Sequence, residues 1–192
     1  MHNARTSLVL VAALALSACG GGSKLMKADL DLTKQNKAKL AVISLTVSDF
    51  GKTLQATSDS NVGELVTKKM NQMLSIAEAS FGQSWTVVPA ESFVATEGYK
   101  KYSIGQLFQG VYGPKIGEAG MLSFSKKRGD LVKTSLEPTV AAKICGELGV
   151  DLIVLVYSEW TTQTGGVVPT TKALTKNVVG MYDSRGRMLF QD

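Results

Sequence analysis

Short apolar runs and amphipathic segments alternate along most of the chain. Residues 40–47 (LAVISLTV) and 151–157 (DLIVLVY) are rich in branched aliphatic side chains, which is typical of strands buried on both faces. Between them, apolar residues recur at helical spacing from Val62 to Phe81, which predicts an amphipathic helix packed on a sheet. Strands that alternate with helices in this way indicate an α/β fold.

Prolines and glycines mark the ends of further elements. Residues 85–88 (WTVV) are expected to form a strand that ends at Pro89, and this proline can open a short helix. Pro138 is expected to open a longer helix, and Gly149 has the position of its C-terminal stop. These boundaries place a further helix directly before the apolar run at 151–157.

The end of the chain predicts a β-hairpin. Residues 161–169 are rich in Gly and Thr and are interpreted as a loop, and residues 171–182 as a strand. A turn at 183–187 then leads into a return strand at 188–190. The whole order of elements predicts a mixed sheet flanked by helices, that is, an α/β sandwich.

Residues 100–129 are predicted to form an insertion in this fold. Ser103 and Gln106 have capping-box spacing, and residues 104–112 carry apolar side chains at the spacing of a short helix. One interpretation is an ordinary core helix followed by a solvated loop; the other is an apolar and basic surface for a partner protein. Under the second interpretation the candidate partner-binding residues are Phe108, Tyr112, Lys126, Lys127 and Arg128.

The first residues have the pattern of a secretory signal. Arg5 precedes an apolar stretch that is too short to span a bilayer as a permanent helix. The stretch ends in Leu-Ser-Ala-Cys, which resembles the lipobox of bacterial lipoproteins. The resemblance implies that the thiol of Cys19 is acylated and becomes the first mature residue. The alternative is an ordinary cleavage site with a chance cysteine.

The residue after the cysteine bears on localisation. Gly20 stands where inner-membrane lipoproteins of enteric bacteria often carry Asp, so the resemblance implies an anchor in the outer membrane, facing the periplasm. Several acyl chains on one residue give stable anchoring. The predicted organisation is a signal peptide at 1–18, the lipidated cysteine with a flexible tether at 19–39, and a single α/β domain at 40–192.

Charge is mild and does not favour nucleic acid as a partner. The net charge is +5 over the full chain. Basic side chains crowd the segment after the cysteine, where they are either part of a solvated tether or lie against anionic lipid or murein. These residues are Lys24, Lys27, Lys34, Lys37 and Lys39.

The supply of chemically reactive side chains is small. The one histidine, His2, falls in the predicted signal peptide, so the mature chain offers no imidazole for a catalytic triad or a metal ligand. Cys145 lies on the apolar side of a predicted helix and is interpreted as a buried small hydrophobe. Neither a cofactor nor a metal is expected. Carboxylate chemistry remains an alternative, with the candidates Asp49, Glu91, Glu97, Glu118 and Asp151.

The segment EPTVAAKICGELGVDLIVLVYSEW, followed by a hairpin through MYDSRGRML, resembles a group of envelope lipoproteins. The group includes the curli secretion lipoprotein, the lipoprotein activators of penicillin-binding proteins and the Pel polysaccharide export lipoprotein. The resemblance implies a fold like the amino-terminal domain of TolB and anticodon-binding domains. It also implies assembly or regulation of an envelope machine through protein contacts. Residues 100–129 lack the long alternating strands of a membrane barrel, so a pore is not expected.

Three functions are therefore considered. The first is a non-enzymatic, outer-membrane-anchored scaffold or regulator of an envelope assembly or secretion complex, with a homo-oligomer as one possible form. The alternative is a periplasmic module that binds a small ligand or glycan near Trp160 and residues 161–169. The third is an enzyme that uses carboxylates alone.

Overall fold

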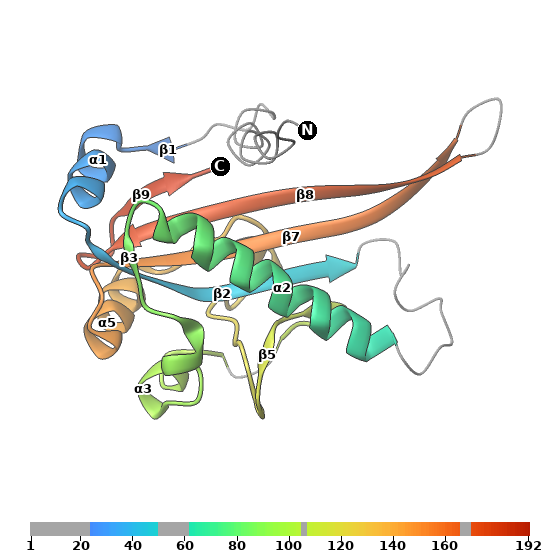
Figure 1. Ribbon diagram of the computed structural model, residues 1–192, viewed down its shortest axis with the longest axis horizontal. Helices are drawn as coiled ribbons and strands as arrows, with labels where there is room; N and C mark the ends of the chain where they lie inside the picture. The colour runs from blue at the N-terminus through green and yellow to red at the C-terminus, as the bar shows by residue number, and fades with distance from the viewer. Residues whose placement is uncertain (1–23, 50–61, 105–106, 166–169) are drawn as a thin grey trace, which may run out of the picture.

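The computed structural model describes residues 24–49, 62–104, 107–165 and 170–192. These residues form a mixed α/β fold in which helices flank a mixed sheet (Figure 1). The strand order is β1-β9-β8-β7-β2-β3, and β4 also pairs with β2. The strands are β1 (Lys24–Leu25), β2 (Lys39–Asp49), β3 (Thr86–Val87), β4 (Val111–Tyr112), β7 (Leu152–Gly165), β8 (Thr170–Asp183) and β9 (Met188–Gln191). A separate small hairpin contains β5 (Lys115–Ile116) and β6 (Ala119–Gly120).

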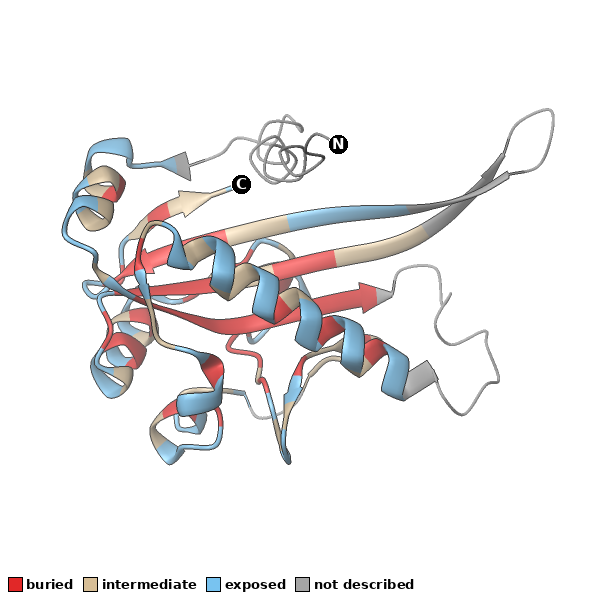
Figure 2. Cartoon of the chain, in the orientation of Figure 1, coloured by how far each residue is buried: buried red, intermediate tan, exposed pale blue. Residues whose placement is uncertain are grey.

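The predicted buried strands are confirmed and lie at the centre of the sheet. β2 pairs in parallel with β7, and β7 pairs with β8 in an antiparallel ladder. Every residue from 40 to 48 is buried, which requires cover on both faces of β2 (Figure 2). The predicted terminal hairpin is confirmed too, because β9 returns along β8 after the turn at 183–187.

The helices lie at several positions around this sheet. α2 confirms the predicted amphipathic helix, and α5 confirms the helix opened by Pro138; Gly149 caps it with a left-handed φ of 63°. No helix among the described residues is both long and apolar enough to cross a membrane. The helices are α1 (Lys27–Gln35), α2 (Val62–Gly82), the 3-10 turn η1 (Ala90–Ser92), α3 (Glu97–Lys100), α4 (Arg128–Val132) and α5 (Pro138–Leu148).

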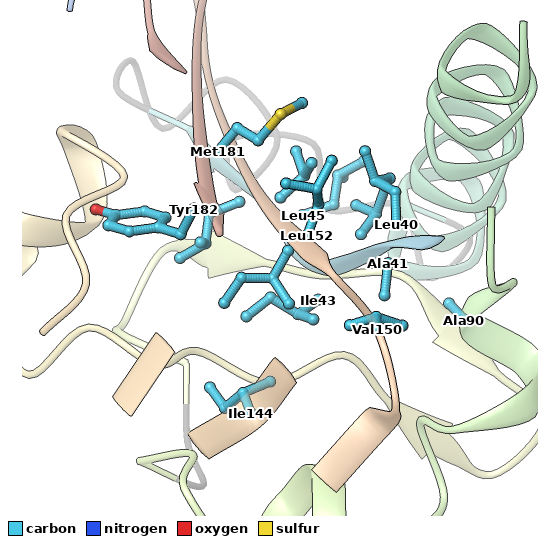
Figure 3. Packing of buried hydrophobic residues seen from close by; sticks show 14 of the residues in the cluster. Leu40, Ala41, Ile43, Leu45, Ala90, Ile144, Val150, Leu152, Met181 and Tyr182 are labelled. Carbon is cyan, nitrogen blue, oxygen red and sulfur yellow. The ribbon is translucent and has the colours of Figure 1, made fainter. Parts of the chain in front are cut away.

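Neighbouring residues of β8 show how the core is divided between the two faces. The phenol of Tyr182 reaches the segment between α4 and α5, where it donates to the Thr134 carbonyl and accepts from the Leu136 amide. Met181 points to the opposite face (Figure 3), as alternation along a strand requires. Ile144 of α5 lies on the same side as Tyr182, with no exposed surface.

The predicted flexible tether is wrong for residues 24–39. β1 pairs with β9, and α1 follows it, with Leu30 buried. The indole nitrogen of Trp85 donates a hydrogen bond of 3.0 Å to the Thr33 hydroxyl. The return strand thus finds a partner near the start of the folded domain. Residues 1–23, including Cys19, lie outside the described residues.

The helix predicted over residues 104–112 is also wrong. Residues 107–108 have no regular structure, and a turn at Gly110 leads into β4, which pairs with the end of β2. Gly110 has a φ of 73°, which interrupts a right-handed helix. Pairing with β2 satisfies backbone groups that a strand end leaves free, and this long-range contact outweighs the local helical spacing. Gln106 of the predicted capping box lies outside the described residues.

The predicted loop at 161–169 is in large part β-structure. β7 continues to Gly165, and β8 begins at Thr170. The threonines of this segment have high β-propensity, which favours extension of the hairpin over an irregular loop. Residues 166–169 lie outside the described residues.

Candidate functional site

The two aromatic candidates do not lie together on an exposed helix face. Phe108 is partly buried and packs against a small apolar cluster that contains Val111, Leu131 and Tyr157. Tyr112 is partly buried against the main core. Because both rings contribute to packing, the structure gives each of them a structural role beside any role in binding.

The basic candidates fall into two groups. Lys126 and Lys127 are exposed, and no ion pair or side-chain hydrogen bond of either is present among the described residues. Arg128 is exposed as well, but its Nη2 donates a hydrogen bond of 2.8 Å to Ser48 Oγ, and its Nη1 donates one of 3.3 Å to the Gln109 carbonyl. Arg128 therefore joins the end of β2 to the segment before β4, while the two lysines remain available to a partner.

The phenol of Tyr157 lies within reach of the charge of this arginine. Its phenol oxygen is buried and has no hydrogen-bond partner within the described chain, although the Ser48 hydroxyl lies close by without hydrogen-bond geometry. Burial raises the pKa of Tyr157, and the nearby Ser48 hydroxyl and Arg128 charge oppose that rise. The phenol is thus held neutral inside the fold, as a structural tyrosine.

A groove of about 380 Å³ is lined by Lys126 and, on the side of α5, by Glu137 and Val140. Its size is within the range of small-ligand pockets. Ile104 is 37 % exposed at its edge, and Lys143 lies 6.0 Å from the ring centroid of Tyr102. The lining includes Tyr102, Ser103, Ile104, Phe124, Lys126 and Glu137.

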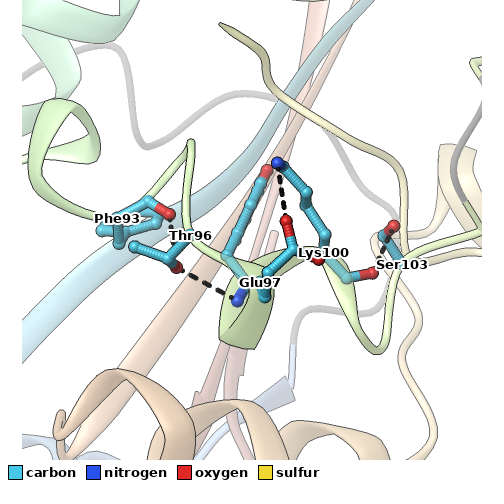
Figure 4. A network of polar contacts seen from close by, with 6 residues as sticks. Phe93, Thr96, Glu97, Lys100 and Ser103 are labelled. Atoms are coloured by element: carbon cyan, nitrogen blue, oxygen red, sulfur yellow. Dashed lines mark hydrogen bonds and ion pairs between the residues drawn. The ribbon is translucent and has the colours of Figure 1, made fainter.

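A local network fixes the segment that leads into this groove (Figure 4). Thr96 caps α3: its hydroxyl donates to the Phe93 carbonyl at 2.8 Å and accepts from the Tyr99 amide at 3.3 Å. Lys100 forms an ion pair of 3.1 Å with Glu97, and its carbonyl accepts a hydrogen bond from the hydroxyl of Ser103. The groove therefore has a rim of definite conformation next to Ile104.

The β7–β8 hairpin forms the most extended feature of the molecule. β2 ends opposite Trp160, and β9 pairs with β8 only over its last residues, so the hairpin continues as a two-stranded ribbon (Figure 1). Fourteen residues in each strand give the whole hairpin a length of about 45 Å, and its two-stranded part covers the pairs from Thr161–Leu174 to Gly165–Thr170. In the described parts of the chain no strand pairs with the outer edges of residues 161–165 or 170–178. The free backbone groups along both edges can accept another strand.

The other residues proposed for chemistry occupy separate places. Trp160 is partly buried and its indole donates to Ser158 Oγ, while the three grooves described for the molecule are lined elsewhere. Among the carboxylates, Glu97 pairs with Lys100, and Asp151 accepts a hydrogen bond from the Lys39 amide. Glu118 is fully exposed in the β5–β6 hairpin, and the side chain of Asp49 lies outside the described residues. Cys145 is buried, as predicted, and burial raises its pKa to about 12.

Two surfaces were not found from the sequence. The ribbon was interpreted as a loop because of its glycines, although its threonines carried the β signal. The surface of β1 and α1 was interpreted as tether because of its lysines and polar residues. The signal that could have revealed it was Leu25 and Leu30, two large apolar residues that a solvated tether does not require.

Comparisons with protein-family models, with curated proteins and with solved structures gave no match for this chain. The likeness to envelope lipoproteins therefore stays a prediction from the sequence pattern. The α/β fold with its mixed sheet follows from the structure itself. A function has to be argued from the surfaces described above.

Proposed function

We propose that this protein is a lipid-anchored envelope protein that works by protein contact, without catalysis. Cys19 carries the anchor in the outer membrane, and the folded domain faces the periplasm. The domain acts as a scaffold or regulator of an envelope assembly or secretion complex. The support for the anchor is the sequence Leu-Ser-Ala-Cys after an apolar stretch.

The β7–β8 ribbon is the single observation that carries the role in protein contact. A two-stranded ribbon is marginal in water without a third strand or a packed face. Its exposed described side chains are a mixture, with Leu174 43 % exposed beside Thr175 and Lys176. An exposed edge with high β-propensity is a template for strand addition. A two-stranded ribbon with two free edges is therefore best explained by a protein partner or by a second copy of the chain.

The likeness to the amino-terminal domain of TolB agrees with this role but is not needed for it. In the proposed family, related domains assemble envelope machines, and several form oligomers. The lysines at 126 and 127 supply a second exposed contact surface. No pore is proposed, because the role assigned to the ribbon is contact with another protein.

The test is to shorten the ribbon without touching the body. Residues 162–173 are replaced by Asn-Gly, which closes a two-residue hairpin after the pair Thr161 and Leu174. Wild-type lipidated protein is extracted with mild detergent from cross-linked envelopes, sized, and its companions are identified. We expect a discrete assembly for the wild type and its loss in the short variant. The circular dichroism spectrum of the short variant should still be that of a folded α/β domain.

The control variant changes the tip of the other hairpin, Glu118→Ala, and should keep the assembly. An assembly that survives ribbon shortening contradicts the role of the ribbon. A wild-type protein that runs as a monomer with no companion contradicts the scaffold as a whole.

A small-ligand or glycan-binding module is the second candidate function. The groove beside Ile104 favours it, because Tyr102 and Phe124 offer aromatic surface and Lys126 and Glu137 offer polar groups. Near Trp160, where the sequence analysis expected the ligand site, none of the described grooves is found. Binding by this module predicts a bound small molecule in native mass spectra of the monomer, and Ile104→Asp should remove it.

A further inference from the structure

Three exposed large apolar side chains lie close together in sequence at the start of the folded domain. Among the described residues, large apolar side chains are exposed at seven positions, and three of these fall between 25 and 32. Leu25 is 53 % exposed, Met26 40 % and Leu32 54 %. We call these three residues the β1–α1 surface. Leu32 stands out because Leu30, two positions before it in α1, is buried.

Exposed basic side chains lie near the β1–α1 surface. Lys27 and Lys37, at either end of α1, are exposed, and neither side chain has a partner among the described residues. Arg185 is exposed in the β8–β9 turn, which is tied to α1 by the ion pair of 3.2 Å between Arg187 and Asp29. The combination of exposed leucines with nearby cations matches the boundary between lipid headgroups and acyl chains.

The distance to the proposed lipid anchor limits where this surface can lie. Five peptide units separate Cys19 from Lys24, the first residue of β1. A fully extended chain spans at most about 3.6 Å per residue, so Lys24 lies within about 18 Å of the lipidated cysteine in any conformation. The predicted tether of 19–39 would have reached several times further. The start of β1 is therefore the part of the described domain that the proposed anchor keeps nearest to the bilayer.

We propose that the β1–α1 surface docks on the bilayer surface, with Leu25, Met26 and Leu32 at the headgroup boundary. Lys27, Lys37 and Arg185 face anionic lipid phosphates. This proposal rests on the lipidation of Cys19 in the proposed function. In Figure 1, α1 and the far end of the β7–β8 ribbon lie at opposite ends of the longest axis of the molecule. Docking through α1 thus directs the ribbon away from the membrane, toward periplasmic partners.

The experiment measures which side chains reach the lipid. Lipidated protein carrying Leu32→Cys in a Cys145→Ala background is labelled with an environment-sensitive fluorophore. It is then placed in vesicles of phosphatidylethanolamine and phosphatidylglycerol with or without brominated acyl chains. We expect a blue shift and strong quenching by the brominated lipids. The matched control is Ile76→Cys, which is 66 % exposed on α2 and should show neither effect.

A second pair of variants tests the charges. Lys27→Glu together with Lys37→Glu should weaken docking by at least about fivefold for each charge, measured as loss of quenching at position 32. The control is Lys68→Glu with Lys69→Glu on the exposed side of α2, which should leave quenching unchanged.

The outcomes separate this proposal from the anchor itself. Mass spectrometry of the same sample reports whether Cys19 carries lipid, and flotation reports whether the protein stays with the vesicles. Lipidated, vesicle-bound protein with no quenching at position 32 overturns the docking proposal and leaves the anchor intact. A label shielded only after extracted envelope proteins are added overturns it in favour of a protein interface. Absence of lipid on Cys19 overturns the proposed anchor, and docking with it.

Discussion

The phenol of Tyr99 donates a hydrogen bond of 2.8 Å to the backbone carbonyl of Ile43 in β2. The same oxygen accepts a hydrogen bond of 2.9 Å from the amide of Leu122. Tyr99 is fully buried, and its ring packs edge-on against Phe124 at a centroid distance of 5.4 Å. One side chain from α3 therefore joins the central sheet to the buried segment that follows β6.

Replacing this tyrosine by phenylalanine should destabilise the domain strongly. Tyr99→Phe keeps the ring but leaves the Ile43 carbonyl and the Leu122 amide without their partner inside the core. An unsatisfied buried group costs about 1–3 kcal/mol, so we expect a loss of about 3 kcal/mol in the free energy of unfolding, measured by urea denaturation. Tyr102→Phe is the control, because the Tyr102 hydroxyl makes an exposed hydrogen bond to Glu147, and it should change stability by less than about 0.5 kcal/mol. Equal losses in both variants contradict this role of Tyr99.

The buried thiol of Cys145 predicts a loss of stability at alkaline pH. Burial, followed by the charges of Asp183 and Asp151, raises its pKa from the ordinary value of 9.0 to about 12. Between these values the unfolded chain releases the thiol proton while the folded chain retains it. The contribution to stability is fully present below pH 9 and is lost as the pH rises from about 9 to 12. The slope approaches about 1.4 kcal/mol per pH unit at most.

The measurement compares urea midpoints of wild type and Cys145→Ala at pH 8 and pH 10. The alanine variant is less stable at both pH values because it leaves a small cavity, but its midpoint should fall less with pH. Several buried tyrosines also have raised pKa values and act in both proteins, so the difference between the two slopes isolates the thiol. If the midpoints of the two proteins fell equally with pH, this would falsify the role of the Cys145 thiol in the alkaline loss of stability.

The elements predicted correctly are those whose signal is local or nearly so. β2 and the first half of β7 are runs of branched aliphatic residues that only a doubly covered strand accommodates. α2 shows a sustained helical period, and Pro138 with Gly149 delimits α5 by backbone geometry alone. The burial of Cys145 followed from its position on that helix.

The elements that were missed depend on contacts between distant segments. The spacing from Ile104 to Tyr112 fits a helix, but the free edge of β2 takes up β4 instead. β1 has only two residues and exists because β9 lies beside it. The helix on which both aromatic candidates were placed does not form for the same reason, and their contact with a partner stays a prediction. Lys126 and Lys127 are exposed, and their contact with a partner stays a prediction too.

The β8–β9 turn should depend on the carboxylate of Asp183. Its Oδ1 accepts hydrogen bonds from the amides of Arg185 and Arg187, at 3.0 and 2.8 Å, and its Oδ2 accepts one of 2.8 Å from Nε of Arg187. Asp183→Ala removes both acceptor oxygens and these three hydrogen bonds at a buried position and should cost about 2–3 kcal/mol of the free energy of unfolding. Asp183→Asn keeps an oxygen for the two amides and should lose about 1 kcal/mol, because the Arg187 side chain is partly exposed. Similar losses in the two variants would show that the ion pair, not the turn, dominates.

Variants in the basic cluster at 126–128 should affect stability and binding separately: Arg128 contributes to stability, and Lys126 and Lys127 to binding. Arg128 holds Ser48 and the Gln109 carbonyl, so Arg128→Ala should lower the free energy of unfolding by about 1 kcal/mol. Lys126 and Lys127 make no such contacts among the described residues, so reversing both to Glu should leave the unfolding midpoint unchanged. If these lysines meet an acidic partner surface, the double reversal slows association and weakens the co-extracted assembly.

The salt dependence of the extracted assembly tests whether Lys126 and Lys127 contact the partner. Wild-type assembly should weaken as ionic strength rises, because exposed charge pairs are screened over about 10 Å at 0.1 M salt. The double reversal Lys126→Glu with Lys127→Glu should remove most of that dependence, and Lys68→Glu with Lys69→Glu on α2 should keep it. Retained assembly with unchanged salt dependence in the first variant would remove the two lysines from the contact surface and leave the β7–β8 ribbon as the sole candidate.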